Sequence, residues 1–155
     1  MVVVSNSSPL IALARIQRLD LLPIIFGSVL IPPAVAREIA PSIPVLPTWL
    51  QIQVPNVLPP ASLLRRRLGD GEWEAIALAI ALKADWIILD DLSARRPAEA
   101  TGLNVIGTLS TLVTAKRAGL LKSIRPELDA LLRTSFFLSP QLYDELLQAA
   151  GEIDS

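Results

Sequence analysis

Short β-branched runs alternate with helical patterns along most of this chain, and this alternation constrains the fold more than any other feature. We expect strands at residues 2–4, 29–31, 86–89 and 104–106. We expect helices at about residues 8–16, 19–26, 32–39, 72–82, 93–101, 108–118, 124–133 and 140–149. Strands that are joined through helices pair in parallel. The sequence therefore predicts an α/β fold with a mostly parallel central sheet and helices on both faces.

A few segments interrupt this pattern. The proline-rich segment 41–60 should be extended, with a short strand at 50–54. A brief helix is expected at 63–68, and the glycines of segment 69–71 should break it before the next helix begins. Pro97 lies inside an expected helix and removes a backbone donor there, so that helix should start late or bend.

The composition indicates one apolar domain. A length of 155 residues suits a single domain that spans residues 1–155. Apolar residues make up 52% of the chain and charged residues 19%, and the mean hydropathy is +0.50. This balance indicates a sheet covered on both sides and an apolar surface that a second subunit closes. We therefore expect a homodimer.

Neither a membrane span nor a secretion signal is expected. The longest uncharged stretch, 39–64, holds six prolines, which a membrane-spanning helix would not tolerate. Residues 1–5 have neither a basic start nor a long apolar segment. The absence of cysteine excludes disulfides, thiolate zinc sites and cysteine nucleophiles. The cytoplasm is the expected location.

Carboxylates must carry any acid–base or metal chemistry in this chain, because it has no histidine and no cysteine. Asn6 follows the first expected strand, and Asp90 and Asp91 end a buried apolar one. The carboxyl ends of parallel strands converge on one edge of a sheet, where open α/β folds bind ligands. Glu72 starts one helix and Glu38 lies on another, so both can face the same cleft. Oxygen clusters of this kind select Mg²⁺ or Mn²⁺, which activate water and stabilise charge at phosphorus.

Several segments resemble a known family. They are Val4–Ile11, Ile31–Val35 with Glu38, Gly69–Ile76, Ile87–Asp91, Gly107–Leu109 and Ala115–Gly119. In this order, over nearly the whole chain, they resemble the PIN-domain family, in particular the VapC-like toxin ribonucleases. The resemblance implies a PIN-like three-layer α/β/α fold and a Mg²⁺- or Mn²⁺-dependent endoribonuclease that hydrolyses RNA phosphodiesters. It also implies a small antitoxin protein as partner, and often a dimer.

The resemblance assigns roles to single residues. Its acidic set maps onto Asn6, Glu38, Glu72 and Asp90 or Asp91. Glu72 and one or both of the paired aspartates would hold the metal. Glu38 would bind the metal through water or orient the nucleophile, and Ser8 would support the first acid. The family has aspartate after the first strand, whereas this chain has Asn6. An asparagine carbonyl can ligate Mg²⁺ but adds no charge to hold it.

Three functional hypotheses follow. The first is a metal-dependent ribonuclease of the toxin type. The second is a catalytically weakened PIN-like module that binds RNA or a protein without cutting, because Asn6 replaces the aspartate. The third is a receiver or phosphatase in which Asp90 or Asp91 accepts a phosphoryl group. The third is disfavoured, because such folds place their decisive aspartates after the first strand, where this chain has Asn6.

Structural roles compete with each functional role. Asp91 can cap the helix that follows it, and Glu72 can balance a helix dipole. Glu38 can be a solvated helix residue, and Asn6 a turn residue.

The formal charge of −1 argues against a globally electrostatic nucleic-acid binder, but local basic clusters can still contact RNA. These clusters are Arg65–Arg67, Arg95–Arg96, and Lys116–Arg117 with Lys122. The RNA hypothesis gains if two of them flank the acids. Trp49, Trp73 and Trp86 are expected to pack rather than to stack on bases, and the last helix can close the domain or bind a partner.

Overall fold

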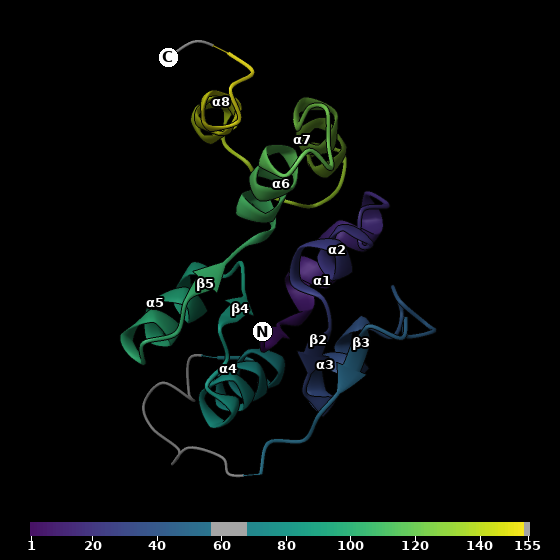
Figure 1. Cartoon of the computed structure of the whole chain (residues 1–155), viewed down its shortest axis with the longest axis vertical. Coiled ribbons are helices and arrows are strands. Elements are labelled where there is room, and N and C mark those ends of the chain that lie inside the picture. Colours follow the sequence, from purple (N-terminus) through teal and green to yellow (C-terminus); the bar gives the residue numbers. More distant parts are fainter. Residues whose placement is uncertain (57–67, 154–155) are drawn as a thin grey trace.

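Five short parallel strands form one central sheet in the order β3-β2-β1-β4-β5 (Figure 1). The computed structural model describes residues 1–56 and 68–153. The strands are β1 (Val3–Ser5), β2 (Val29–Ile31), β3 (Leu50–Ile52), β4 (Trp86–Ile88) and β5 (Val105–Ile106). Every neighbouring pair is parallel. The predicted parallel α/β sheet is therefore confirmed.

Helices connect the strands and cover the sheet in a three-layer α/β/α arrangement. They are α1 (Ser7–Arg15), α2 (Leu21–Phe26), α3 (Pro33–Ile39), α4 (Asp70–Leu82), α5 (Leu92–Ala100), α6 (Thr108–Arg117), α7 (Arg125–Leu132) and α8 (Pro140–Ala149). The chain crosses from β1 to β3 in one direction and from β3 through β4 to β5 in the other. Because such crossovers are right-handed, this reversal places helices on opposite faces. In Figure 1, α6, α7 and α8 gather at one end of the molecule and α4 lies at the other.

The direction of winding reverses between β1 and β4, which lie side by side. Their register pairs Val3 with Trp86 and Ser5 with Ile88. Val4 and Ile87, at the middle of the two strands, have no exposed surface. In open α/β sheets, the carboxyl ends of the strands at such a reversal border the ligand-binding crevice. The residues that follow β1 and β4 are therefore the first candidates for a functional site.

Most expected elements are present, with two local corrections. Helix α4 begins at Asp70, so the glycines of segment 69–71 do not delay it to Glu72; Gly69 is its N-cap and Gly71 lies in its first turn. Helix α5 runs without interruption from Leu92 through Pro97, so it does not start late. The helix expected at 63–68 lies, apart from its last residue, outside the described residues.

The tryptophans contribute to packing, as expected. Trp73 belongs to the buried core, and Trp49 and Trp86 pack against it half-buried. In the described part of the chain, no helix is long and apolar enough to cross a membrane.

Polar contacts hold the segment that follows α8 against the domain. The Glu152 carboxylate accepts hydrogen bonds from the Ser123 hydroxyl and, at 2.7 Å, from the Ile124 N–H. Lys116 lies 3.2 Å from the same carboxylate. Burial alone would raise the pKa of Glu152, but these hydrogen bonds and the lysine charge together lower it to about 2. Glu152 therefore fastens the carboxyl-terminal segment to α6 and to the start of α7.

Replacing Glu152 with glutamine is expected to destabilise the fold by about 1–2 kcal/mol at pH 7, after allowance for solvent screening near the surface. A carboxyl whose pKa is lower in the folded state stabilises the protein above its unfolded pKa, and that contribution disappears as the pH falls toward the folded value. The difference between wild type and Glu152→Gln in urea unfolding should therefore shrink below pH 4.5 and vanish near pH 2.

The control is Glu145→Gln on the exposed side of α8, where Gln141 donates to the carboxylate at 3.2 Å. This variant should leave the unfolding midpoint nearly unchanged. Equal midpoints for wild type and Glu152→Gln at pH 7 would contradict the proposed fastening role.

Candidate active site at the carboxyl edge of the sheet

Asn6 and the paired aspartates lie side by side at the carboxyl edge of the sheet. Asn6 follows β1, and its N–H donates to the Ile88 carbonyl of β4 at 2.9 Å. Asp90 and Asp91 come two and three residues after Ile88. The Asn6 side chain is buried, with 2% of the residue exposed. The expected convergence of these residues on one edge is therefore present.

The two aspartates have different partners. The Asp91 carboxylate accepts the Ser93 N–H at 2.9 Å and the Ser93 hydroxyl at 2.8 Å, so it caps α5. The Asp90 carboxylate instead accepts the Thr108 N–H at 2.7 Å and the Thr108 hydroxyl at 2.5 Å. Burial raises the pKa of Asp90, and Thr108 and the charge of Arg95 only partly offset this effect. Asp91 thus caps α5, whereas Asp90 binds the first residue of α6.

Glu38 reaches the same edge from α3. Its Oε1 accepts the Ser7 hydroxyl at 2.7 Å, and that hydroxyl lies 3.3 Å from Asn6 Oδ1. A Cβ atom on Gly71 would lie only 1.8 Å from Glu38 Oε1, so the absence of a side chain on α4 makes room for this carboxylate. The hydroxyl beside Asn6 therefore belongs to Ser7, not to Ser8 as the resemblance implied.

Glu72 holds the most unusual carboxylate of the group. Its Oε1 accepts the Gly69 N–H at 3.4 Å, whereas its Oε2 is buried and has no hydrogen-bond partner. Burial raises the pKa of Glu72 most, followed by the charge of Asp91. The charge of Glu38 raises the pKa further, and the Gly69 N–H lowers it only in part. An unpaired buried oxygen among acids favours a proton or a cation there.

We call Asn6, Glu38, Glu72 and Asp91 the acidic cluster. Within residues 1–56 and 68–153, no three acidic side chains are placed to share one metal ion. Mg²⁺ does not need such a cage, because it usually keeps several waters and takes one or two carboxylates together with substrate phosphates. The neighbouring carboxylates of Glu72 and Asp91 fit that type of site.

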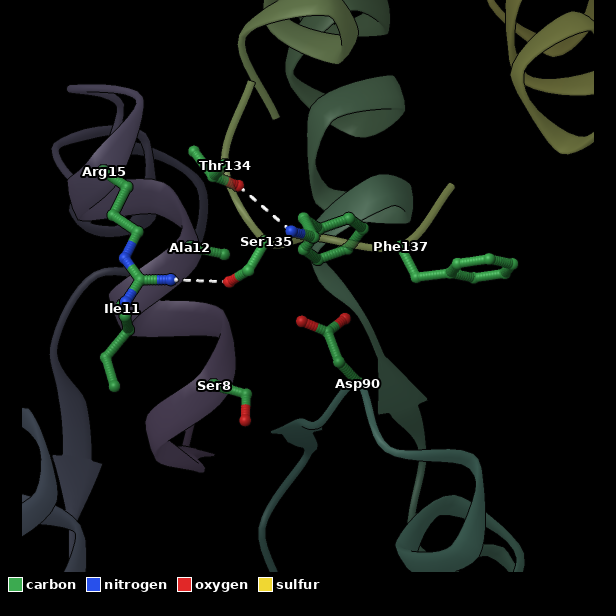
Figure 2. A pocket seen from close by; sticks show the side chains of 9 residues that line it. Ser8, Ile11, Ala12, Arg15, Asp90, Thr134, Ser135 and Phe137 are labelled. Carbon is green, nitrogen blue, oxygen red and sulfur yellow. Dashed lines mark hydrogen bonds between the residues drawn. The ribbon is translucent and has the colours of Figure 1, made fainter. Parts of the chain in front are cut away.

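A cavity of about 380 Å³ lies beside the acidic cluster. It is lined by Ser8, Ile11, Ala12, Arg15, Asp90, Thr134, Ser135, Phe136 and Phe137. Figure 2 shows Ser8 and Arg15 on α1, with Asp90 and the segment 134–137 facing them. Arg15 Nη1 donates to the Ser135 hydroxyl at 3.2 Å, which joins the two walls. We call this hollow the α1 cavity.

The basic clusters differ in their positions. Arg65–Arg67 lies outside the described residues. Arg95 approaches the site, since a Cβ atom on Gly107 would lie 3.5 Å from its Nη1 and 2.7 Å from Asp90 Oδ1. Arg117 is used elsewhere: its Nη2 donates to the Ala149 carbonyl at the end of α8. Two basic clusters flanking the acids are therefore not found in the described part of the chain.

Sequence reasoning missed the roles of Ser7, Gly71 and Thr108. Thr108 follows β5, at the same sheet edge as Asp90, and this placement was a usable signal. Ser7 and Gly71 could not be found in this way, because their roles depend on how closely α3 approaches α1 and α4. The α1 cavity was missed as well, since segment 134–137 is distant in sequence from the acids.

Comparisons with known proteins agree with this architecture. A family model described as a PIN domain matches residues 2–152. A solved structure of a PilT N-terminus domain protein from the hyperthermophilic archaeon Sulfolobus solfataricus P2 is similar, with 20% identity and a TM-score of 0.59. The match covers 74% of this chain and 93% of that protein, and at this identity it supports the fold alone. A search of curated proteins gave no match. Since the family model covers nearly the whole chain, this chain belongs to the PIN-domain family.

Proposed function

We propose that this protein is a Mg²⁺- or Mn²⁺-dependent endoribonuclease of the toxin type. The observation that carries the proposal is the buried Glu72 Oε2, which has no hydrogen-bond partner although Asp91 and Glu38 are close enough to raise the pKa of Glu72. A fold gains nothing from burying an unpaired carboxylate oxygen beside other acids, because the desolvation and the repulsion both oppose folding. A bound cation would remove both penalties.

The residues present fit such an ion. Glu72 and Asp91 would hold it, and the Asn6 carbonyl oxygen would be a neutral, weaker ligand. When bound, the ion would activate water and stabilise the charge that develops on a phosphodiester. Glu38 would accept a proton from the attacking water and pass it to solvent, with the Ser7 hydroxyl keeping its carboxylate in place. Thr108 binds both carboxylate oxygens of Asp90. Asp90 would thereby position α6 against the site.

One observation favours a second function, a binding module that does not cut. Asn6 is neutral where the family has aspartate, and no three acids of the described residues are arranged around one point. A protein of this kind would bind RNA or a partner protein at the same edge of the sheet and leave it intact.

The two functions are separated by incubating the protein with a mixed RNA pool in millimolar Mn²⁺ or in EDTA. We expect cleavage by the wild type only with the metal, and its loss in the double variant Asp90→Asn with Asp91→Asn. Glu99→Gln, which removes an exposed acid from α5, is the matched control and should cut like the wild type. RNA that stays intact with wild-type protein in Mn²⁺ while binding persists would select the binding module.

The proposal extends to partners and location. We propose a cytoplasmic homodimer that is controlled by a small antitoxin protein. Large apolar side chains with much exposed surface support an interface of this type; they include Ile24, Val45, Ile52, Val54 and Leu92. Sedimentation of the purified chain would test the dimer, and a small protein that co-purifies with the chain and abolishes its RNA cleavage would test the antitoxin.

A further inference from the structure

The first turn of α3 has no side-chain cap of its own. The helix follows Pro32, whose side chain cannot accept a hydrogen bond, and it begins at Pro33, which has no N–H. The first N–H groups of a helix find no acceptor within that helix, so they need partners from outside it. The first such group in α3 belongs to Ala34, which is buried. Its partner must therefore come from another element of the fold.

Glu74 supplies this partner from α4. The Glu74 side chain is half-buried, and its Oε1 accepts the Ala34 N–H at 3.1 Å. The two helices pack against each other (Figure 1). Ala34 and Glu38 are four residues apart and share one face of α3, whereas Gly71 and Glu74 are three residues apart and share one face of α4. The same pair of faces therefore carries both this hydrogen bond and the close approach of Glu38 to Gly71.

Two contacts thus attach α3 to α4, one at each end of α3. At its start, Ala34 donates to Glu74, and near its end, the Glu38 carboxylate occupies the space beside Gly71. The order of the contacts is reversed between the two helices, so α3 and α4 run in opposite directions where they meet. A helix of seven residues is marginal by itself and takes its position from such packing. With only one of the two contacts, α3 would be able to shift along α4.

The position of α3 matters because Glu38 must reach the acidic cluster. The Glu38 carboxylate accepts the Ser7 hydroxyl at 2.7 Å. A group that takes part in catalysis has to be held within about 0.5 Å of its productive position by the residues around it. A small shift of α3 would therefore break the contact with Ser7 and move Glu38 away from the site.

We infer that Glu74 is a positioning residue of the candidate active site: by capping α3 from α4, it holds Glu38 where this carboxylate takes a proton from the attacking water. The inference rests on the proposed ribonuclease function and adds to it a residue that touches neither the metal nor the RNA. A cap that served stability alone would leave the chemical step unchanged in the folded protein. Loss of Glu74 should therefore slow the reaction even where the protein remains fully folded.

The kinetics of Mn²⁺-dependent RNA cleavage test this role, at a temperature where circular dichroism shows every variant to be folded. We expect Glu74→Ala to lower kcat by about tenfold to 100-fold. The KM for RNA and the Mn²⁺ concentration for half-maximal rate should stay nearly unchanged, because Glu72 and Asp91 would hold the ion. Glu74→Gln keeps an oxygen that can accept the Ala34 N–H and should retain most of the kcat. Glu99→Ala, which removes an exposed acid from α5, is the control and should cut like the wild type.

Two measurements by NMR in EDTA follow the contacts without any cleavage. The Ala34 amide should exchange its hydrogen slowly in the wild type and in Glu99→Ala, and quickly in Glu74→Ala. The Ser7 amide signal should shift in Glu74→Ala, because the Glu38 carboxylate moves away from the Ser7 hydroxyl.

Three outcomes overturn the assignment: equal exchange of the Ala34 amide in wild type and Glu74→Ala, wild-type kcat in Glu74→Ala, or equal losses of kcat in Glu74→Gln and Glu74→Ala. Failure of the proposed nuclease is visible separately, as an absence of cleavage by the wild type. In that case the Ser7 signal decides: a shift in Glu74→Ala supports the positioning of Glu38 by Glu74, and an unchanged signal contradicts it.

Discussion

Glu72→Gln is expected to lower metal-dependent RNA cleavage by more than about 100-fold and, at the same time, to stabilise the metal-free protein. Cleavage falls because a neutral amide holds a divalent cation poorly. Stability rises because glutamine carries no charge to bury, and its amide N–H groups can donate to the Asp91 carboxylate that Glu72 repels. Opposite effects on activity and stability would show that the fold keeps this carboxylate for function.

The pH dependence of the unfolding free energy tests the same expectation independently. The folded state raises the pKa of Glu72, so the folded protein takes up this proton more readily than the unfolded chain. The penalty is therefore fully present above the folded pKa, and protonation relieves it as the pH falls. Thermal unfolding in EDTA should show that the stabilisation by Glu72→Gln is largest at pH 7 and shrinks as the pH falls toward the unfolded value of 4.5.

Glu99→Gln on α5 serves as the matched control for both measurements. It should change neither cleavage nor the pH dependence of unfolding. A Glu72→Gln protein that is less stable than the wild type in EDTA would mean that the carboxylate has a structural partner, which would remove the main support for a cation site.

Asn6→Asp is expected to make the stability of the fold depend on divalent metal. The new carboxylate would be buried, since the Asn6 residue is 2% exposed, and it would face the Ser7 hydroxyl that Glu38 already uses. Without metal, the added charge should lower the Tm. With Mn²⁺, a tenfold gain in affinity corresponds to about 1.4 kcal/mol, or about 3–6 °C of additional Tm shift for a chain of this size.

Thermal scans of wild type and Asn6→Asp across a Mn²⁺ titration would measure this effect, with RNA cleavage as a second readout that should also increase. Asn104→Asp is a suitable control, because Asn104 precedes β5 at the opposite edge of the sheet and donates to the Asp85 carbonyl. It should cost stability without metal dependence. Identical Mn²⁺ responses of wild type and Asn6→Asp would remove residue 6 from the ligand set.

The strands could be predicted because short β-branched runs and the helices between them are local features, whereas their order in the sheet was not predicted. The convergence of Asn6 with Asp90 and Asp91 follows from parallel pairing alone. The different partners of Asp90 and Asp91 could also have been anticipated, since consecutive residues at the end of a strand point to opposite sides. Which aspartate faces Glu72 could not, because that depends on where α4 begins.

Long-range packing explains the remaining misses. One of them is the contact between α3 and α4, where Glu38 occupies the space beside Gly71. The α1 cavity forms only when segment 134–137 reaches across to α1, which is more than a hundred residues earlier in the sequence. No local pattern encodes either contact.

Gly71 has a consequence for any attempt to make this protein more robust. Alanine is a better helix former than glycine by up to about 1 kcal/mol, so a survey of helix propensities would select Gly71→Ala as an improvement to α4. The added methyl group would occupy the place of Glu38 Oε1 and drive that carboxylate away from Ser7. Thermostability engineering guided by propensity alone would therefore erase one acid from the site while leaving every acidic residue in the sequence.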